Sequence, residues 1–499
     1  MTHSTARRLF PLFHPDRLAA ALVLLAVAVR WPWLSVQSIA FDESFSLAVS
    51  RANWPVLFQA VLSDGVHPPL YYVLHKGTLA LFGLPEFGQR FDAAVFSVLA
   101  VALVYRAGRI FAGSRAGLAA ALLLALNPVH VWLSQEARMY SLLIALTITA
   151  MTFFWQAVER GRRRDWAGLA AVHAVIFTLH YFGFLVPTVQ FLFLLTTFRR
   201  NHRRLRMWAF AQAVAFLPLL PWLVATARRE AQTFGIGFLV RPDIVDLPVT
   251  FWNLLVGAST RLGTVSLLLG VLVGGFFLFA LRPPTGTGRA RRVWLLLTLW
   301  AAAPPVITWL VSQRRSFYAD RYLSFTIPAL VLLLAGAWLR VDIRWRKPVL
   351  VALTAATALG LVAVRLDPAF HKDDWRGAAA CIDRQARRGD VILLYSTHIK
   401  LVFDYYHRGP VPVRPISLNL QQFEIDPLTA DAVRAWVVYP YTRRPTHYPL
   451  QPLMPNGYWH TDPQRNPLLV DWFDRHRQGV VDYRHFRGVE VWLVEVRNP

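Results

Sequence analysis

Apolar stretches long enough to cross a lipid bilayer occupy most of the first 365 residues, and they constrain the fold more than any other feature. A helix needs about 20 mostly apolar residues to span the hydrocarbon core. Charged residues make up only 16% of the chain, against about 25% in soluble globular domains. The sequence therefore predicts an all-α polytopic membrane domain of about eleven transmembrane helices, near residues 18–36, 88–111, 115–132, 137–157, 165–180, 181–198, 206–226, 262–281, 292–312, 322–340 and 347–365.

Two apolar regions and the first span need a closer interpretation. Residues 165–198 form one run interrupted only at His180–Gly183, which predicts two helices joined by a tight hairpin. Residues 68–83 are apolar too, but their two prolines and Lys76 favour an interfacial segment over a span. The first span could instead be a signal peptide, because Ser38–Ala40 resembles a small-residue cleavage site. Its long apolar run favours a membrane helix.

Arginine-rich loops alternate with acidic and aromatic loops along the series of spans. The positive-inside rule assigns the arginine-rich loops and the N-terminus to the cytoplasm. The loops that hold Asp42, His180 and Asp320 then face outward, and the odd number of spans places the C-terminal tail outside as well. Most of the formal net charge of +24 lies between the spans, which favours topology signals and anionic lipids over nucleic acid as its explanation.

The chain changes character at Asp367, where the last span ends and a mixed tail begins. Short apolar runs between turn residues predict strands, and Asp374–Arg387 predicts a helix before the first of them. The predicted strands are Val391–Tyr395, Ala435–Tyr439 and Val489–Val496. The sequence thus predicts a membrane domain over residues 1–365 and an extracytoplasmic α/β domain over residues 366–499.

An acidic pair, Asp42-Glu43, follows the first span directly. Carboxylates in a membrane protein are costly and usually functional. One interpretation is structural, because an aspartate can cap a helix that begins near Ser44 and a glutamate in the first turn suits the helix dipole. The other is catalytic, with either carboxylate as a general base that deprotonates an acceptor hydroxyl; Asp42 is favoured as the base, with Glu43 as its positioning partner.

A segment rich in proline and tyrosine closes the same outward loop. His67 precedes two prolines, which fix an extended backbone, and Tyr71 and Tyr72 follow. The segment could anchor a re-entrant loop through an aromatic belt, since tyrosine favours the headgroup level. Alternatively, His67 and one of the tyrosines line a pocket for sugar or phosphate. Lys76 extends either to a phosphate or only to water.

Charged residues at further outward positions are candidates for phosphate binding. Arg138 lies in an almost uncharged loop, and Arg321 follows two more arginines in a loop where the positive-inside rule predicts few. A guanidinium can bind phosphate through two hydrogen bonds. A simpler explanation of these charged residues is that they are solvated or contact lipid headgroups. Glu136 could face the sugar or a metal, and Arg30, near the outer end of the first span, either snorkels to the surface or binds phosphate.

Taken in order, these motifs resemble the GT-C superfamily of membrane glycosyltransferases. The resemblance is closest to the bacterial branch related to protein O-mannosyltransferases, the lipid A aminoarabinose transferase and the rhizobial lipopolysaccharide galacturonosyltransferases. It covers roughly residues 18–365, and the tail is similar to the exported α/β domain that many such enzymes carry. The residues that carry it are Arg30, Phe41-Asp42-Glu43, His67-Pro68-Pro69-Leu70-Tyr71-Tyr72, Gln135-Glu136-Ala137-Arg138-Met139-Tyr140, His180-Tyr181 and Asp320-Arg321-Tyr322.

The resemblance implies an inverting hexosyl or pentosyl transferase in the bacterial inner membrane, with a polyprenyl-phosphate sugar as donor and a cell-envelope lipid, glycan or protein as acceptor. It implies that Asp42 activates the acceptor and that Arg138 and Arg321 neutralise the lipid phosphate. No obligatory cofactor is expected, although members of the family differ in their use of a divalent cation. Further site residues are Glu43 and Glu136 beside the base, and Arg30, His67, Tyr71, Tyr72, Lys76, Tyr140, His180, Tyr181 and Tyr322 at the donor.

A polytopic transporter or flippase of lipid-linked sugars is the alternative. Intramembrane charges and many spans suit such a protein as well. Transporters of this size often have paired halves with broken helices, and the sequence has no such symmetry. The sequence leaves open the sugar, the acceptor, the length of the prenyl carrier and the oligomeric state.

Overall fold

The structure is a computed structural model of the chain, and it describes residues 14–198, 201–227, 241–257, 264–286, 288–395, 397–416, 425–440 and 467–496. The chain divides into two compact units. The first unit comprises Met1–Leu34 and Ala52–Leu366, and the second comprises Ser35–Arg51 and Asp367–Pro499. Residues 35–51, which the sequence places in the membrane domain, therefore belong to the second unit.

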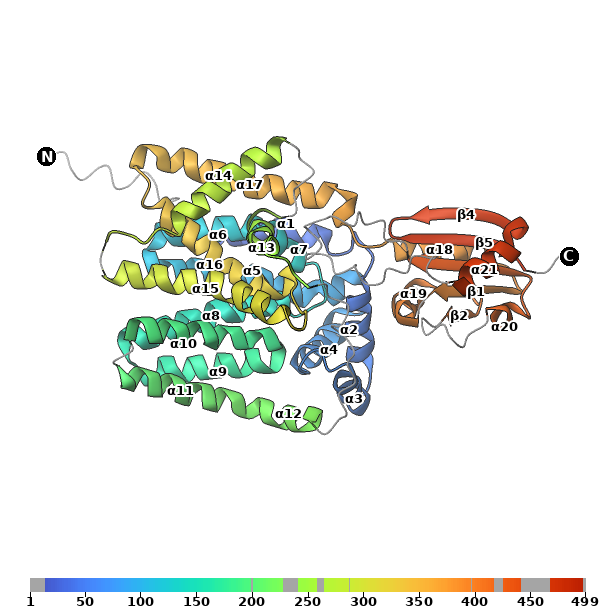
Figure 1. Cartoon of the computed structure of the whole chain (residues 1–499), viewed down its shortest axis with the longest axis horizontal. Helices are drawn as coiled ribbons and strands as arrows, with labels where there is room; N and C mark the ends of the chain where they lie inside the picture. The colour runs from blue at the N-terminus through green and yellow to red at the C-terminus, as the bar shows by residue number, and fades with distance from the viewer. Residues whose placement is uncertain are drawn as a thin grey trace. The chain divides into compact units, whose positions relative to one another are not determined.

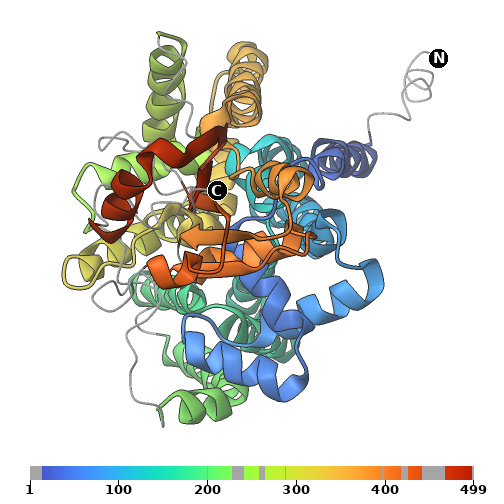
Figure 2. The same ribbon diagram turned by 90° about the vertical axis from the view of Figure 1, so that its right-hand side faces the viewer.

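The first unit is a bundle of helices, many of which lie roughly parallel in Figure 1, and several are seen close to their axes in Figure 2. Its α-helices are α1 (Pro15–Arg30), α3 (Trp54–Asp64), α4 (Leu70–Phe82), α5 (Glu86–Ala112), α6 (Ser114–Leu126), α7 (Pro128–Leu133), α8 (Tyr140–Arg160), α9 (Arg163–Leu179), α10 (Leu185–Phe198), α11 (His202–Phe216), α12 (Leu220–Ala227), α13 (Asp246–Val256), α14 (Thr264–Ala280), α15 (Gly288–Ser312), α16 (Ile327–Trp338) and α17 (Ile343–Leu366). Short 3₁₀ helices interrupt the bundle at η2 (Trp31–Trp33), η3 (Tyr181–Phe184), η4 (Leu217–Leu219) and η6 (Asp320–Thr326).

Helices occupy all eleven ranges in which spans are predicted. Within the described part of the chain, seven helical segments are long and apolar enough to cross a membrane by length and composition. The first unit is thus mostly helical, as the sequence predicts, while the division into two domains and the number of spans stay predictions. α4 occupies the predicted interfacial segment. The sequence does not predict α3 or α13, because each is only 11 residues long and lies outside the long apolar runs.

The predicted helical hairpin is present, and a close approach explains the glycine at its turn. Phe177 of α9 stacks on Phe184 of η3, with ring centroids 4.6 Å apart. A Cβ atom on Gly183 would lie 2.3 Å from Ile176 Cγ2, so a side chain at this position would force η3 to shift away from α9. This tight return fixes His180 at the tip of the hairpin.

The second unit contains a five-stranded mixed sheet with strand order β2-β1-β3-β5-β4. β1 pairs in parallel with both β2 and β3, whereas β5 is antiparallel to both β3 and β4. The strands are β1 (Asp390–Tyr395), β2 (Val413–Ile416), β3 (Arg434–Pro440), β4 (Val480–Phe486) and β5 (Val489–Glu495). The helices of this unit are α2 (Phe41–Arg51), α18 (Trp375–Gln385), α19 (Lys400–Tyr406), α20 (Asp426–Thr429) and α21 (Pro467–Arg475), with 3₁₀ turns η7 (Pro368–Phe370), η8 (Thr397–Ile399) and η11 (Arg477–Gly479).

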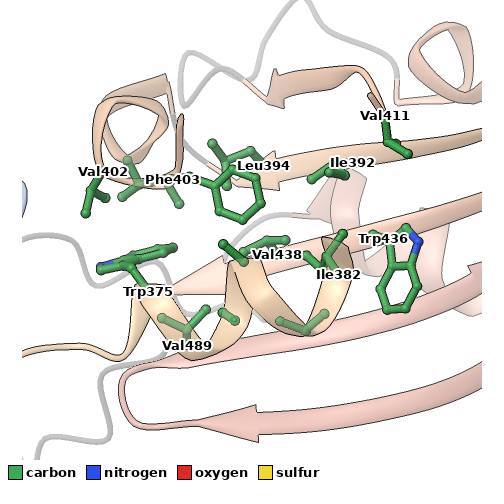
Figure 3. Close-up of a cluster of buried hydrophobic side chains, with 14 of the residues drawn as sticks. Trp375, Ile382, Ile392, Leu394, Val402, Phe403, Val411, Trp436, Val438 and Val489 are labelled. Atoms are coloured by element: carbon green, nitrogen blue, oxygen red, sulfur yellow. The ribbon is translucent and has the colours of Figure 1, made fainter. Parts of the chain in front are cut away.

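Two buried cores lie on opposite faces of the sheet, because successive strand residues point to opposite sides. In the first core, Trp375 of α18 and Phe403 of α19 meet Leu394 of β1 (Figure 3). Ile39 belongs to the same core, and its backbone N–H donates to Tyr406 Oη at 2.8 Å. The segment before α2 is therefore an integral part of this α/β unit.

The three predicted strands are confirmed as β1, β3 and β5, and the predicted helix is α18. Asp374 caps α18, with its Oδ1 accepting from the Gly377 N–H at 2.9 Å. The sequence does not predict the edge strands β2 and β4. β2 is four residues long and contains Pro415, and β4 is largely exposed, so neither has the apolar pattern of a buried strand.

Candidate functional site

Four segments far apart in the sequence converge within the first unit. His67 precedes α4, Tyr140 opens α8, His180 lies between α9 and η3, and Tyr322 lies in η6. The ring centroids of His67 and His180 are 5.0 Å apart, and those of His180 and Tyr322 are 5.9 Å apart. The Tyr140 ring lies 5.9 Å from His180 and 6.3 Å from Tyr322. We call these four residues, together with Arg138 and Arg321, the arginine–histidine cluster.

Both arginines of the cluster are buried. The Arg321 guanidinium lies 5.1 Å from the Tyr322 ring centroid and 6.0 Å from that of Tyr140. It also donates to Tyr322 Oη at 3.3 Å. Arg138 lies in the segment between α7 and α8, where its backbone N–H donates to the Glu136 carbonyl at 2.7 Å. The cluster thus contains two guanidinium groups with aromatic rings beside one of them.

The charges of the cluster favour an anionic ligand. Burial lowers the pKa of His67 well below its usual range, and the positive charges of Arg138 and Arg321 lower it further. His67 is therefore neutral at physiological pH. The positive charge of the cluster comes from arginine, which stays charged and matches phosphate geometry. Glu136, also buried, is the acidic residue of the same segment as Arg138.

The fold fixes the orientation of the His180 ring. His180 Nδ1 accepts from the Phe182 N–H at 3.1 Å, which leaves the ring hydrogen of the neutral form on Nε2. Among the described residues, no hydrogen-bond partner meets the buried Nε2 atom. His180 can therefore donate one hydrogen bond to a bound group.

A buried carboxylate holds η6, and with it Arg321, in place. Asp320 accepts from Thr250 Oγ1 and Asn253 Nδ2, each at 2.6 Å. The Thr250 hydroxyl also lies 2.8 Å from Tyr318 Oη. These bonds join η6 to α13 directly beside the cluster. The sequence motif identifies Asp320 but not its two partners.

Other predicted donor residues have contacts outside the cluster. Tyr71 packs on Tyr72 at a centroid distance of 5.7 Å, and both are buried. Tyr181 Oη accepts from Trp222 Nε1 at 3.1 Å. Lys76 donates to the Ala52 carbonyl at 2.7 Å and lies 5.3 Å from the Trp54 ring centroid. Their roles in donor binding stay predictions.

Arg30 is fully buried, so the prediction that it snorkels to the surface is wrong. Its guanidinium donates to Ser97 Oγ at 2.7 Å and to the Ala125 carbonyl at 3.0 Å. It also lies 3.0 Å from His130 Nδ1. These partners replace water and make the buried charge tolerable. Phosphate binding by Arg30 stays a prediction.

The two carboxylates of the acidic pair lie in different surroundings within the second unit. Glu43 is fully buried, its Oε2 lies 2.7 Å from Lys372 Nζ, and it accepts from the Ala40 N–H at 2.8 Å. Asp42 is partly exposed. Because α2 begins at Phe41, Asp42 lies inside the first turn, and the interpretation of Asp42 as a helix cap is wrong. The glutamate bonds back to the backbone at the helix start instead.

Sequence reasoning misses Lys372, because 329 residues separate it from Glu43. It also misses the pair of buried His75 and partly buried Asp92, whose Nδ1 and Oδ2 atoms are 3.1 Å apart. A polar residue inside an apolar helix indicates that it has a polar partner, but the sequence does not identify that partner. Among the described residues, no group of three or more His, Cys, Asp or Glu side chains is placed to hold a metal ion.

Replacing Lys372 with methionine is expected to destabilise the second unit by about 3–5 kcal/mol, because the buried Glu43 carboxylate loses the positive charge of the Lys372 ammonium. Thermal unfolding of the purified chain measures this loss. The double variant Glu43→Gln/Lys372→Met is expected to recover most of it. Lys400→Met is the matched control, because it breaks an exposed pair with Asp404, which is worth about 0–1 kcal/mol. Equal midpoints for the two single variants would refute a structural role for the buried pair.

The chain is similar in sequence to one family model and to two curated proteins. A family model described as dolichyl-phosphate-mannose-protein mannosyltransferase matches residues 66–224. The curated undecaprenyl phosphate-alpha-4-amino-4-deoxy-L-arabinose arabinosyl transferases of Pseudomonas paraeruginosa and Pseudomonas aeruginosa are each 31% identical over 177 residues, or 34% of this chain. The match spans about a third of the length of these relatives, 32% in each case.

Solved structures are similar over nearly the whole chain. ArnT from Cupriavidus metallidurans, in the apo state and bound to undecaprenyl phosphate, gives TM-scores of 0.60 and 0.61 at 16% identity, over 95% of this chain and 97% of that one. The apo oligosaccharyltransferase of Archaeoglobus fulgidus gives 0.56 at 12% identity, over 88% of this chain and 70% of that one. At these identities the likeness establishes a shared fold.

Proposed function

We propose that the chain is a membrane glycosyltransferase of the GT-C superfamily that transfers a sugar from a polyprenyl-phosphate donor to an acceptor in the cell envelope. The observation that carries the proposal is the arginine–histidine cluster. A buried site with two arginines and a neutral histidine suits a phosphate with an attached sugar better than it suits a cation or an apolar ligand. The reaction takes place at the outer face of the bacterial inner membrane.

In the proposed reaction, the bond between sugar C1 and the phosphate oxygen breaks, and its electron pair goes to the phosphate. The donor phosphodiester carries one negative charge, and the departing phosphate gains a second. Arg138 and Arg321 stabilise this added charge, an electrostatic contribution that is strongest in a site shielded from water. The fold shared with ArnT, which has been solved with undecaprenyl phosphate, supports a polyprenyl phosphate as the carrier.

Asp42 is the proposed general base. It accepts the proton of the acceptor hydroxyl as the new C1–O bond forms on the face of the sugar opposite the phosphate, so the configuration at C1 inverts. Glu43 is buried and paired with Lys372, whereas Asp42 is partly exposed. This difference favours Asp42 as the base and Glu43 as a positioning residue.

The remaining polar groups of the cluster orient the donor. His180 has its Nε2 hydrogen ready to donate, and neutral His67 beside it can donate or accept without adding charge. Tyr140 and Tyr322 offer ring faces and hydroxyls, which suit sugar recognition. Lys76, Tyr71, Tyr72 and Tyr181 complete the proposed donor site.

Donor turnover by the purified full-length chain in lipid nanodiscs tests the proposal. A panel of polyprenyl-phosphate sugars is offered with a cell-envelope extract as acceptor, and release of free polyprenyl phosphate is followed by mass spectrometry. We expect release from one donor of the panel. The absence of release from every lipid-linked donor would contradict the proposal and favour a transporter of lipid-linked sugars.

A further inference from the structure

An apolar cavity of about 330 Å³ lies among five helices of the first unit, away from the residues of the arginine–histidine cluster. Helices α5, α6, α14, α15 and α16 contribute its walls. The lining is mostly aliphatic and aromatic, with small residues where the helices approach one another. Examples are Phe111, Ala116, Ala280, Val293, Leu333 and Gly336. An apolar cavity of this kind does not hold ordered water well, since water needs several polar partners.

The cavity and the cluster lie at opposite ends of the membrane bundle. α8 begins at Tyr140, in the cluster, and Glu159 lies near its other end. At 1.5 Å per residue these two residues are about 28 Å apart along the helix, close to the hydrocarbon thickness of about 30 Å. Glu159 Oε2 lies 3.8 Å from Arg289 Nε, and Arg289 lines the cavity.

Two arginines line the cavity, Arg289, which is about half exposed, and Arg340, which is partly buried. Arg289 donates to the Ile110 carbonyl at 2.7 Å, and Arg340 donates to the Phe279 carbonyl at 3.0 Å. Carbonyl groups orient a guanidinium but do not neutralise its charge. A guanidinium has five N–H donors, so these carbonyl bonds leave donors for an anionic ligand. Glu159 is the acidic partner of Arg289, and it is also 3.0 Å from Arg292. Positive charge therefore exceeds negative charge beside the cavity.

We propose that this cavity binds a chain of an anionic phospholipid, whose phosphate lies between Arg289 and Arg340, at the membrane face opposite the arginine–histidine cluster. The aliphatic and aromatic walls favour a lipid chain, because burying apolar surface is favourable. The arginines add a preference for an anionic headgroup over a zwitterionic one. The bound lipid stabilises the packing of α14, α15 and α16, and this role does not depend on the proposed glycosyl transfer.

Substitution of one glycine tests the site. A Cβ atom on Gly336 would meet no atom within 4 Å, so leucine there fits on α16 and fills the cavity. Gly275 of α14 is equally open but does not line the cavity, so Gly275→Leu is the matched control. Thermal unfolding of the full-length chain in detergent is measured with phosphatidylglycerol, with phosphatidylcholine of the same acyl chains, and with undecaprenyl phosphate.

We expect phosphatidylglycerol to raise the unfolding midpoint of the wild type and of Gly275→Leu by several degrees more than phosphatidylcholine does, and not that of Gly336→Leu. The double variant Arg289→Gln/Arg340→Gln is expected to lose the difference between the two lipids, and it provides the test if Gly336→Leu does not fold. Equal shifts with both phospholipids in the wild type, or a full phosphatidylglycerol shift in Gly336→Leu, would overturn the proposal. A shift only with undecaprenyl phosphate would overturn the phospholipid assignment and identify a prenyl-lipid site.

Discussion

Asp42→Asn is expected to lower sugar transfer by about 10²–10⁴-fold, the range in which a general base contributes to catalysis. Asparagine keeps the size of the side chain but cannot take a proton from the acceptor hydroxyl. Donor binding and folding are expected to change little, because Asp42 is partly exposed and its neighbour Glu43 keeps the ion pair with Lys372. Release of polyprenyl phosphate in nanodiscs, measured with the donor identified from the panel, gives the rate.

The matched control is Asp404→Asn, which removes an exposed carboxylate from the same unit. Its transfer rate is expected to equal that of the wild type. Donor binding, measured separately by the shift in unfolding midpoint, distinguishes lost chemistry from lost affinity. Turnover retained within a few-fold in Asp42→Asn would remove Asp42 as the base and direct attention to Glu136.

Arg321→Ala and Arg138→Ala are each expected to lower kcat/KM for the donor by about 10–150-fold. A hydrogen bond to a charged group is worth about 1.5–3 kcal/mol, and each 1.36 kcal/mol is a tenfold change in rate. Arg321→Lys is also expected to lower kcat/KM for the donor, although lysine keeps the positive charge. Lysine lacks the planar guanidinium that donates two hydrogen bonds to one phosphate. Steady-state kinetics over a range of donor concentrations checks both statements.

Arg315→Ala is the control for this series. Arg315 precedes η6 in the same loop but is exposed, so its loss is expected to leave kcat/KM for the donor unchanged. A fall as large as that of Arg321→Ala would mean that the loop attracts the donor by its total charge rather than by bonds from one arginine. Unchanged donor kinetics in both Arg138→Ala and Arg321→Ala would remove the arginine–histidine cluster as the phosphate site.

The length of the apolar runs makes the membrane fold predictable from the sequence. Apolar runs near 20 residues give each long helix its approximate limits, and the polar break at His180 locates the hairpin turn. The short helices α3 and α13 cannot be predicted in this way, because an 11-residue helix has no distinct long apolar run. The edge strands β2 and β4 escape it too, since exposed strands have no buried face to impose an alternating pattern.

Many residues of the candidate site can be predicted from the sequence for a different reason. Alternate loops of a membrane protein lie on the same side, so the sequence predicts His67, Arg138, His180 and Arg321 on one side of the membrane. The structure brings them close together. The hydrogen-bond partners of the individual residues cannot be predicted from the sequence. The bonds from Thr250 and Asn253 to Asp320 span 70 and 67 residues, and pairings at such separations depend on how whole helices pack.

The inclusion of residues 35–51 in the second unit has a practical consequence for chimeras and truncations. A cut at residue 366 would look like removal of a detachable module, yet it would deprive Glu43 of Lys372 and Ile39 of Tyr406. Activity lost on such truncation would therefore not show that the tail recognises the acceptor. A functional exchange of tails between relatives would have to carry both segments, the short one and the long one, as a matched set.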